Sequence, residues 1–241
     1  MVLMIHYHGG PITPDTCALK VWSARHAFVS FAVTRQMNLA AEVTQSFALD
    51  NGAFTFWKQG HGVRWADYYA WVDMWRTHPG FDFAVVPDVI DGSESENDHL
   101  ADEWPFPRHQ GAVVWHVNES LDRFYRLAAG WPRVCIGSSG EYDVSRPKKF
   151  LERATEAIGA VCDHAGRPIC KLHGLRMLNP VIFSKLPPSS ADSTNVARNI
   201  GIDSAWKGTY QPKSKETRAA ILTERIESYN SAAALEGWDL L

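Results

Sequence analysis

Short apolar runs recur along the chain, and most of them end in small or polar residues. They cover residues 3–10, 28–33, 46–52, 81–88, 112–118, 133–140, 168–174 and 189–193. Runs of this length that end in Gly, Asp, Asn or Ser are typical of buried β-strands. The pattern of apolar and polar positions therefore predicts a strand at each of these places.

Segments with helical periodicity lie between several of these strands. They cover residues 65–78, 119–130 and 147–166, with a short helix at 179–188 that is capped by Asn179 and has Pro180 in its first turn. Strands that alternate with helices build a parallel sheet, and eight such units in 241 residues match the size of a (β/α)₈ barrel. The sequence therefore predicts an α/β fold, a single TIM-like barrel over residues 1–241.

The composition excludes several classes of protein. Hydrophobic residues make up 45% and charged residues 21% of the chain, as in an ordinary globular protein. No apolar run approaches the ~20 residues of a membrane span, and the first residues lack the features of a signal peptide. The four cysteines form no CxxC pair, which argues against a disulfide scaffold and a zinc ribbon. We expect a protein of the reducing cytoplasm without a membrane partner.

The net charge of −3 means that a polyanionic partner would need a local basic patch. A basic stretch at about 205–218 lacks apolar periodicity, so we expect a loop or arm there, followed by a closing helix at about 216–237. A second basic group lies near the end of the sixth strand. The candidate nucleic-acid-binding residues of the two groups are Lys207, Lys213, Lys215 and Arg218, and Arg146, Lys148 and Lys149. A solvated charged loop explains any single one of them equally well.

Chemistry in a barrel of this kind takes place at the C-terminal ends of the strands. Three carboxylates, Asp50, Asp88 and Asp192, are expected at three of those ends. A single one would be an ordinary turn or cap residue, but three on one face raise one another's pKa and therefore need a functional reason. The other candidates at strand ends are His6, His8, Asn51, Gly52, His116, Gly137, Ser138, His173 and Gly174.

Two chemistries and one non-catalytic role fit these residues. The carboxylates can act directly as a nucleophile, a proton shuttle and an acceptor for a base. Alternatively, a metal-dependent hydrolase would use ligands in the order found in amidohydrolase barrels, and His6 and His8 would then share one face of a strand. A nucleic-acid binder that keeps the barrel is the third possibility, although it would not need three carboxylates facing a polyanion. The ligands of the metal-dependent alternative are His6, His8, His116, His173 and Asp192.

Five short motifs resemble, in the same order, the strand ends of the tRNA-guanine transglycosylases. They are ALDNGAF (48–54), VVPD (85–88), VCIGSSG (134–140), KLHGLRM (171–177) and SADSTNVAR (190–198). In that family the corresponding strands carry an Asp before Ser-Gly-Gly-Phe, a second Asp, Gly-Gly-Leu, Leu-x-Gly-x-Gly and the nucleophilic Asp. The last motif is most similar to the Asp-Ser form of archaeosine enzymes and phage relatives.

The resemblance implies a role for each matching residue. Asp192 would attack C1′ of the target nucleotide and form a covalent glycosyl-enzyme, as carboxylates do in glycosidases. Asp50 would act as general acid and base, Asp88 would accept hydrogen bonds from a guanine-like base, and the amide near Gly137 would donate to its O6. The remaining residues implied in substrate binding are His116, Ser138, His173, Gly174, Asn51 and Gly52.

The chain departs from the family pattern in two respects. His116 stands where the family has Gln, which leaves the base preference open. No Cys follows Cys170, so the zinc-binding subdomain is missing, and so are the RNA-binding C-terminal domains. The chain is thus most similar to the phage-type 7-deazaguanine DNA transglycosylases, whose activity would place it in the host cytoplasm if it is phage-encoded.

The resemblance implies a pentosyltransferase that replaces guanine in a polynucleotide with a 7-deazaguanine such as 7-cyano-7-deazaguanine (preQ0). We expect DNA rather than tRNA as the polynucleotide, and no metal or organic cofactor. In this interpretation His6 and His8 would line the pocket for the base or the sugar.

Overall fold

The computed structural model describes residues 4–138 and 140–235. Within these residues, parallel strands form a closed barrel in which each strand pairs with the next and β8 pairs with β1. The strands are β1 (Ile5–Gly9), β2 (His26–Ser30), β3 (Ser46–Asp50), β4 (Phe81–Val85), β5 (Gly111–His116), β6 (Arg133–Gly137), β7 (Lys171–Gly174) and β8 (Ser190–Ser193). A strand overlaps each of the predicted runs, although β2 and β5 begin before theirs, and the predicted single (β/α)₈ barrel is confirmed. Ser139, in the sixth run, lies outside the described residues.

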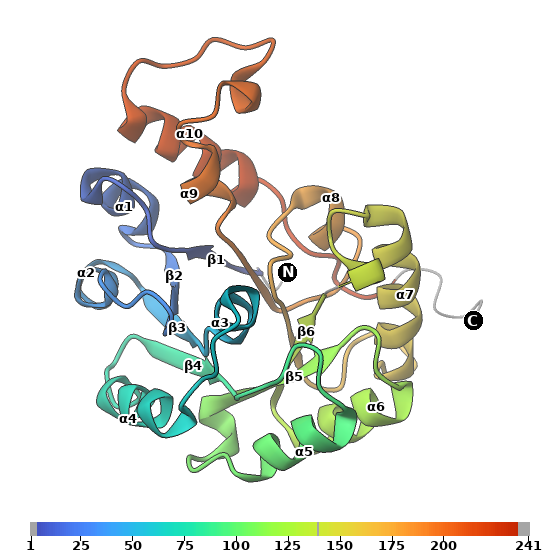
Figure 1. Ribbon diagram of the computed structural model, residues 1–241. Helices are drawn as coiled ribbons and strands as arrows, with labels where there is room; N and C mark the ends of the chain where they lie inside the picture. The colour runs from blue at the N-terminus through green and yellow to red at the C-terminus, as the bar shows by residue number, and fades with distance from the viewer. Residues whose placement is uncertain (1–3, 139, 236–241) are drawn as a thin grey trace.

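Helices surround the strands, as Figure 1 shows. In the described part of the chain they are α1 (Asp15–Trp22), α2 (Met37–Val43), α3 (Ala53–Gln59), α4 (Trp65–Trp75), α5 (Glu94–Asp102), α6 (Leu121–Gly130), α7 (Pro147–Ala160), α8 (Pro180–Phe183), α9 (Asn195–Asn199) and α10 (Lys215–Glu227). Short 3₁₀ helices are η1 (Arg108–Gln110), η2 (Gly140–Tyr142) and η3 (Asp203–Trp206). The four helices predicted between residues 65 and 188 are present, although each is shorter than its predicted range.

The C-terminal helix and the basic stretch before it differ from the expectation. Ser214 caps α10 by accepting a hydrogen bond from the amide of Thr217, so the helix already includes the last part of the basic stretch. The predicted helix at 216–237 ends at Glu227, and its residues 236–237 lie outside the described part. Only residues 207–214 form the expected loop, which projects away from the strands in Figure 1.

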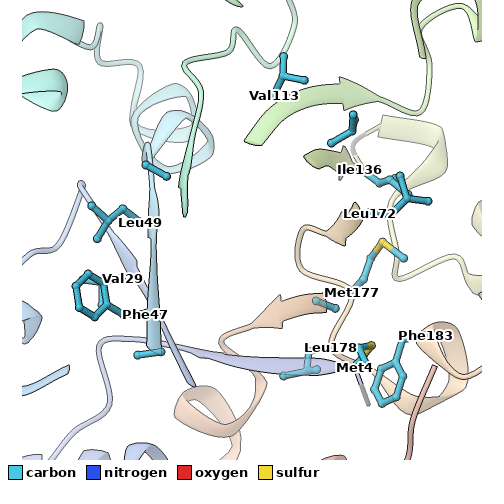
Figure 2. Packing of buried hydrophobic residues seen from close by; sticks show 14 of the residues in the cluster. Met4, Val29, Phe47, Leu49, Val113, Ile136, Leu172, Met177, Leu178 and Phe183 are labelled. Carbon is cyan, nitrogen blue, oxygen red and sulfur yellow. The ribbon is translucent and has the colours of Figure 1, made fainter. Parts of the chain in front are cut away.

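Side chains alternate between the inside of the barrel and the layer beneath the helices, because successive residues of a strand point to opposite faces. Figure 2 shows Val29, Leu49, Val113 and Leu172 in the outer layer. The inner cluster consists of Tyr7, Phe28, Ala48, Phe83, Val85, Ala112, Val114 and Cys135. The barrel interior is therefore a packed core, as is usual for this fold.

A buried polar group closes the N-terminal end of that interior. The hydroxyl of Tyr7 donates to Asp82 at 2.5 Å, and the guanidinium of Arg133 donates to the other oxygen at 3.1 Å. The same guanidinium lies 4.0 Å from the centre of the Phe83 ring. Burial alone would raise the pKa of Asp82, but Arg133 and Tyr7 outweigh it and lower that pKa. This end is electrostatically satisfied, which leaves the opposite end for chemistry.

Candidate active site

A cavity of about 750 Å³ opens at the C-terminal ends of the strands. It is the place where barrel enzymes carry their catalytic groups. Seven of the residues that sequence analysis placed at strand ends line it: Asp50, Asn51, Asp88, His116, Gly137, Ser138 and Asp192. The barrel therefore brings the three predicted carboxylates to one cavity.

Asp192 lies on the inner face of β8 because Ala191, its neighbour, belongs to the outer core. Its side chain is 8% exposed. One oxygen, Oδ1, accepts a hydrogen bond from the backbone amide of Arg176 at 2.9 Å and lies 3.4 Å from Nε2 of His173. The carboxylate is thus held from one side while it lines the cavity.

Asp50 ends β3 on the same cavity. Burial raises the pKa of its carboxyl to about 7, and the charges of Asp192 and Asp88 add to the rise, while hydrogen bonds from Ser30 and the amide of Gly52 oppose it. A carboxyl with this pKa is about half protonated at neutral pH, so it can both donate and accept a proton. Asp50 therefore has the property that a general acid and base requires.

The loop after β3 depends on Gly52, which does not line the cavity. Its φ of +77° favours glycine, and a Cβ at this position would lie 3.0 Å from the backbone nitrogen of Ala32. The side chain of Asn51 then caps α3, because its Oδ1 accepts a hydrogen bond from the amide of Ala53 at 2.8 Å. The predicted motif at this strand end thus serves partly to turn the chain beside Asp50.

Asp88 and His116 form a buried pair on the cavity wall. Oδ1 of Asp88 accepts a hydrogen bond from the side-chain amide of Asn51 at 2.7 Å. Its Oδ2 lies 3.0 Å from Nε2 of His116, an ion-pair contact without hydrogen-bond alignment. Burial lowers the pKa of His116, but Asp88 and the charge of Glu119 raise it by more than burial lowers it. The pKa of His116 is therefore above its ordinary value.

Gly137 on β6 makes room for the ring of His116. A Cβ at Gly137 would lie 2.9 Å from Nδ1 of that ring, closer than real Cβ contacts. Next to it, the buried hydroxyl of Ser138 has no hydrogen-bond partner among the described residues, although Ser138 lines the cavity. The wall therefore contains an unpartnered hydroxyl beside a glycine that lines the cavity and leaves room for the His116 ring.

Two further predicted residues lie next to the cavity without lining it. His173 on β7 is completely buried beneath Asp192, and its ring stacks on Phe28 with centroids 5.2 Å apart. Gly174 is packed against Met177, whose sulfur would lie 2.6 Å from an added Cβ. These two residues support the wall of the cavity from below and do not have the ligand-facing position that was expected.

The predicted place of His6 and His8 is wrong. Tyr7 occupies the inner face of β1, so its two neighbours point outward. Nε2 of His8 lies 2.9 Å from Glu227, and Nε2 of His6 lies 3.0 Å from the backbone oxygen of Tyr229. Both histidines therefore attach the end of α10 to the barrel and do not line a pocket for a base or sugar.

The ligand set of the metal-dependent alternative is consequently divided over different places. His6 and His8 lie outside the barrel wall, His116 pairs with Asp88, and His173 lies below Asp192. In residues 4–138 and 140–235, no three His, Cys, Asp or Glu side chains are grouped so that they could hold a metal ion. The five predicted ligands do not converge.

Arg176 is a site residue that sequence analysis missed. Its φ of +60° is unusual for a residue with a side chain, and its amide donates to Asp192. Its guanidinium lies 4.4 Å from the centre of the Phe54 ring and 3.8 Å from Asp143. Two more cations, Lys58 and Arg198, line the same cavity. Because Arg176 and Arg198 belong to motifs already quoted, their position after strands β7 and β8 was the available signal.

The predicted nucleic-acid-binding residues lie outside the cavity lining. Lys207, Lys213 and Lys215 are exposed, whereas Arg218 donates to the backbone oxygens of Ile200 at 2.7 Å and Pro212 at 2.8 Å. Arg218 thus stabilises the loop before α10 and is a poor candidate for a phosphate ligand.

The second basic group lies closer to the cavity. Arg146, Lys148 and Lys149 border a shallow surface hollow, and Lys149 pairs with Glu141. Ser145, directly before Arg146, lines the cavity. This group is therefore adjacent to the cavity rim.

Of the comparisons with known proteins, only the one with solved structures found similarity. No protein-family model matches the chain, and no curated protein matches it. Within the described residues, no helix has the length and apolar character to cross a membrane.

Among solved structures, the chain is similar to tryptophan synthase alpha-subunits from the hyperthermophile Pyrococcus furiosus. One mutant form has 11% sequence identity and a TM-score of 0.51 over 94% of this chain and 96% of that chain. A second alpha-subunit structure has 10% identity and a TM-score of 0.51 over 93% of this chain and 96% of that chain. Similarity at this level of identity shows a shared barrel fold.

Proposed function

We propose that the protein is a transglycosylase that replaces guanine in DNA with a 7-deazaguanine such as 7-cyano-7-deazaguanine. The observation that carries this proposal is the joint position of Asp192 and Asp50 on one cavity of about 750 Å³. Asp192 is held on one side by the amide of Arg176, and the pKa of Asp50 is about 7. A positioned nucleophile and a carboxyl that titrates near neutrality are the two groups that base exchange needs.

In the first step, Asp192 attacks C1′ of the target nucleotide. The C1′–N9 bond breaks, and the departing guanine takes its electron pair together with a proton from Asp50. A carboxylate nucleophile suits the oxocarbenium-like centre that develops at C1′. The product is an ester between Asp192 and the sugar of the polynucleotide.

In the second step, the incoming 7-deazaguanine takes the place of guanine in the cavity. Asp50, now ionised, removes the N9 proton, and the nitrogen attacks C1′. The bond from C1′ to Asp192 breaks and returns its electron pair to the carboxylate. The carboxyl of Asp50 is protonated again and ready for the next turnover, so no external proton donor is required.

Asp88, Ser138 and the backbone of Gly137 supply the groups for base recognition. The Watson–Crick edge of guanine carries two donors beside an acceptor. Each oxygen of Asp88 has a second lone pair after its contact with Asn51 or His116, so it can accept from the N1–H and the exocyclic amine. The unpartnered hydroxyl of Ser138 can donate to the acceptor O6, and the neighbouring Gly137 lines the same part of the cavity.

A polynucleotide substrate is supported by the cations of the cavity. Lys58, Arg176 and Arg198 line it, and Arg146 and Lys148 lie next to its rim. Cations at these positions can neutralise phosphates near a target nucleotide, which must leave the base stack before Asp192 can reach C1′. With a net charge of −3, the rest of the chain provides no general affinity for DNA.

Incorporation of labelled 7-cyano-7-deazaguanine tests the proposal. Single- and double-stranded DNA and tRNA are incubated with the protein, digested to nucleosides and analysed by mass spectrometry. We expect incorporation into DNA that is lost in Asp192→Ala and kept in Asp73→Asn, a surface aspartate on α4. Incorporation into tRNA alone would refute the choice of DNA, and no incorporation into any of the three would refute the proposed reaction.

A further inference from the structure

A histidine and a serine on neighbouring strands lie directly beneath Asp192. His173 on β7 is paired with Ser190 on β8, and both point into the barrel. Nδ1 of His173 lies 2.8 Å from the hydroxyl oxygen of Ser190. The opposite nitrogen, Nε2, lies 3.4 Å from Oδ1 of Asp192, an electrostatic contact without hydrogen-bond alignment. The imidazole therefore connects the serine with the carboxylate.

The surroundings of the ring determine which nitrogen carries the proton. Phe28 stacks on the ring and the edge of Phe83 contacts it, with centroids 5.2 and 5.1 Å away. Burial lowers the pKa of His173 more than Asp192 raises it, so the ring is neutral and has one N–H. A lone pair on Nε2 would face a carboxylate oxygen, whereas an N–H there is attracted to it. Ser190 can donate to Nδ1, since a hydroxyl is both donor and acceptor.

The two oxygens of Asp192 consequently differ in their surroundings. Oδ1 accepts from the amide of Arg176 at 2.9 Å and faces the Nε2–H of His173. Within the described residues, no hydrogen bond holds Oδ2, and Asp192 lines the cavity. One oxygen is anchored by the protein while the other is available to a ligand.

We propose that His173 is a positioning residue for Asp192. Held by Ser190 as the tautomer with its proton on Nε2, it acts with the amide of Arg176 on Oδ1 and thereby presents Oδ2 to C1′ of the substrate. This inference rests on the proposed base exchange. His173 does not contact the substrate in this arrangement, since it does not line the cavity.

The same contacts persist through the covalent step. When Oδ2 bonds to C1′, the C1′–N9 electron pair leaves with the base, and Oδ1 becomes the carbonyl oxygen of the ester. The amide of Arg176 still donates to Oδ1, and Nε2 of His173 still lies beside it. When the ester breaks in the second step, the electron pair of the C1′–Oδ2 bond returns to the carboxylate in its original orientation.

Substitutions at His173 separate positioning from packing. In His173→Gln the side-chain amide can place an N–H near the position of Nε2, whereas in His173→Asn the shorter amide reaches only Ser190. We expect kcat for base exchange to fall roughly 10- to 100-fold in His173→Asn, the scale of a misplaced reacting group. The KM values for DNA and for the 7-deazaguanine should remain unchanged, and His173→Gln should recover most of kcat. Equal kcat values in these two variants would overturn the inference.

A matched pair at the other end of the barrel supplies the control. Nδ1 of His26 lies 2.8 Å from the hydroxyl of Ser46, again across neighbouring strands. Ser190→Ala should lower kcat because His173 loses the partner that fixes its tautomer, while Ser46→Ala should leave kcat within twofold of the wild type. A fall of the same size in both variants would indicate a general packing defect and refute the positioning role.

NMR spectroscopy tests the tautomer without any activity measurement. Nitrogen shifts of histidine-labelled protein report which ring nitrogen is protonated, and the signal that disappears in His173→Gln belongs to His173. We expect protonated Nε2 in the wild type and mixed tautomers in Ser190→Ala. A proton on Nδ1 would overturn the inference even if the protein exchanges bases. A proton on Nε2 in a protein that exchanges no base would refute the proposed function, and the catalytic part of this inference with it.

Discussion

The two ends of the barrel interior use partly buried carboxylates in opposite ways. At the N-terminal end, Asp82 receives hydrogen bonds from Tyr7 and Arg133, and these partners lower its pKa. At the C-terminal end, Asp50 lies near Asp192 and Asp88, and its pKa is raised to about 7. A compensated carboxylate stabilises the folded chain, whereas an uncompensated one destabilises it. The raised pKa of Asp50 on a cavity therefore makes the C-terminal end of the barrel the candidate for function.

The largest expected effect comes from Asp192, the proposed nucleophile. Asp192→Ala should fold but lose base exchange by at least about 10³-fold, because the covalent route is removed. The rate of 7-cyano-7-deazaguanine incorporation into DNA measures this loss, and circular dichroism checks the fold. If Asp192 served only as a structural residue of β8, the variant would keep near-normal exchange and lose about 1 kcal/mol of stability.

Asp50→Asn should change activity and stability in opposite directions. Exchange should fall by roughly 10²- to 10⁴-fold, the usual contribution of a general acid or base. The free energy of unfolding at pH 8 should rise by about 2 kcal/mol, a discounted value for the energy that a pKa shift of this kind represents. Chemical denaturation of both proteins measures the difference, and a destabilised variant would contradict the environment assigned to Asp50.

The pH dependence of this difference follows from the sign of the shift. The folded-state pKa of Asp50 is about 7, above the ordinary value of 3.8 for an aspartic acid, so the folded protein binds this proton more tightly than the unfolded chain. The contribution of Asp50 to stability is therefore present below about pH 4 and is lost as the pH rises to about 7. The stabilisation by Asp50→Asn should grow over that interval and be constant above it. In single-turnover experiments, formation of the covalent intermediate should slow above pH 7.

A substitution of Asp82, at the N-terminal end of the barrel interior, provides the contrast. Asp82→Asn leaves Arg133 without its buried partner, so we expect a loss of about 2 kcal/mol in the free energy of unfolding. Its kcat should stay within about twofold of the wild type, because Asp82 does not line the cavity. The contribution of Asp82 to wild-type stability should be lost as the pH falls below 3.8, the ordinary pKa of an aspartic acid, because its folded-state pKa is lowered. A large loss of kcat would show that the two ends of the barrel are coupled.

Metal removal tests the alternative hydrolase. The proposed exchange uses carboxyl groups alone, so dialysis against a chelator should leave the rate within about twofold. Elemental analysis of the purified protein accompanies the assay. One zinc, iron or manganese per chain, lost together with activity, would favour the metal-dependent chemistry despite the separated positions of the predicted ligands.

The smallest effect is expected on DNA binding. Neutralising Arg146, Lys148 and Lys149 together should weaken binding by roughly 10-fold and reduce its salt dependence, because these cations lie beside the cavity rim. The same change at Lys207, Lys213 and Lys215 should have less effect, since the first two lie in the loop that projects away from the strands and Lys215 begins α10 directly after it. Titration of labelled DNA at several salt concentrations distinguishes them. A larger effect at the loop would restore it as the main DNA-binding surface.

The amino-acid pattern alone was sufficient for the barrel and for the three acids on its cavity. Alternating strands and helices of regular length leave few topologies, and the strand-end rule places Asp50, Asp88 and Asp192 on one face. The pattern did not determine which residues of each strand point into the barrel. Alternation in β1 places Tyr7 and its two histidines on opposite faces. Because both faces of a parallel strand are buried, the pattern does not tell which of them points inward.

Only the tertiary structure decided the contacts between side chains that lie far apart in sequence. It paired Asp88 with His116, joined His8 to Glu227, and placed the amide of Arg176 against Asp192. Such contacts depend on the register of eight strands and on the paths of the loops between them, to which local propensity is insensitive. The sequence determines which residues are acids, whereas the charge that each acid carries depends on the neighbours that folding brings to it.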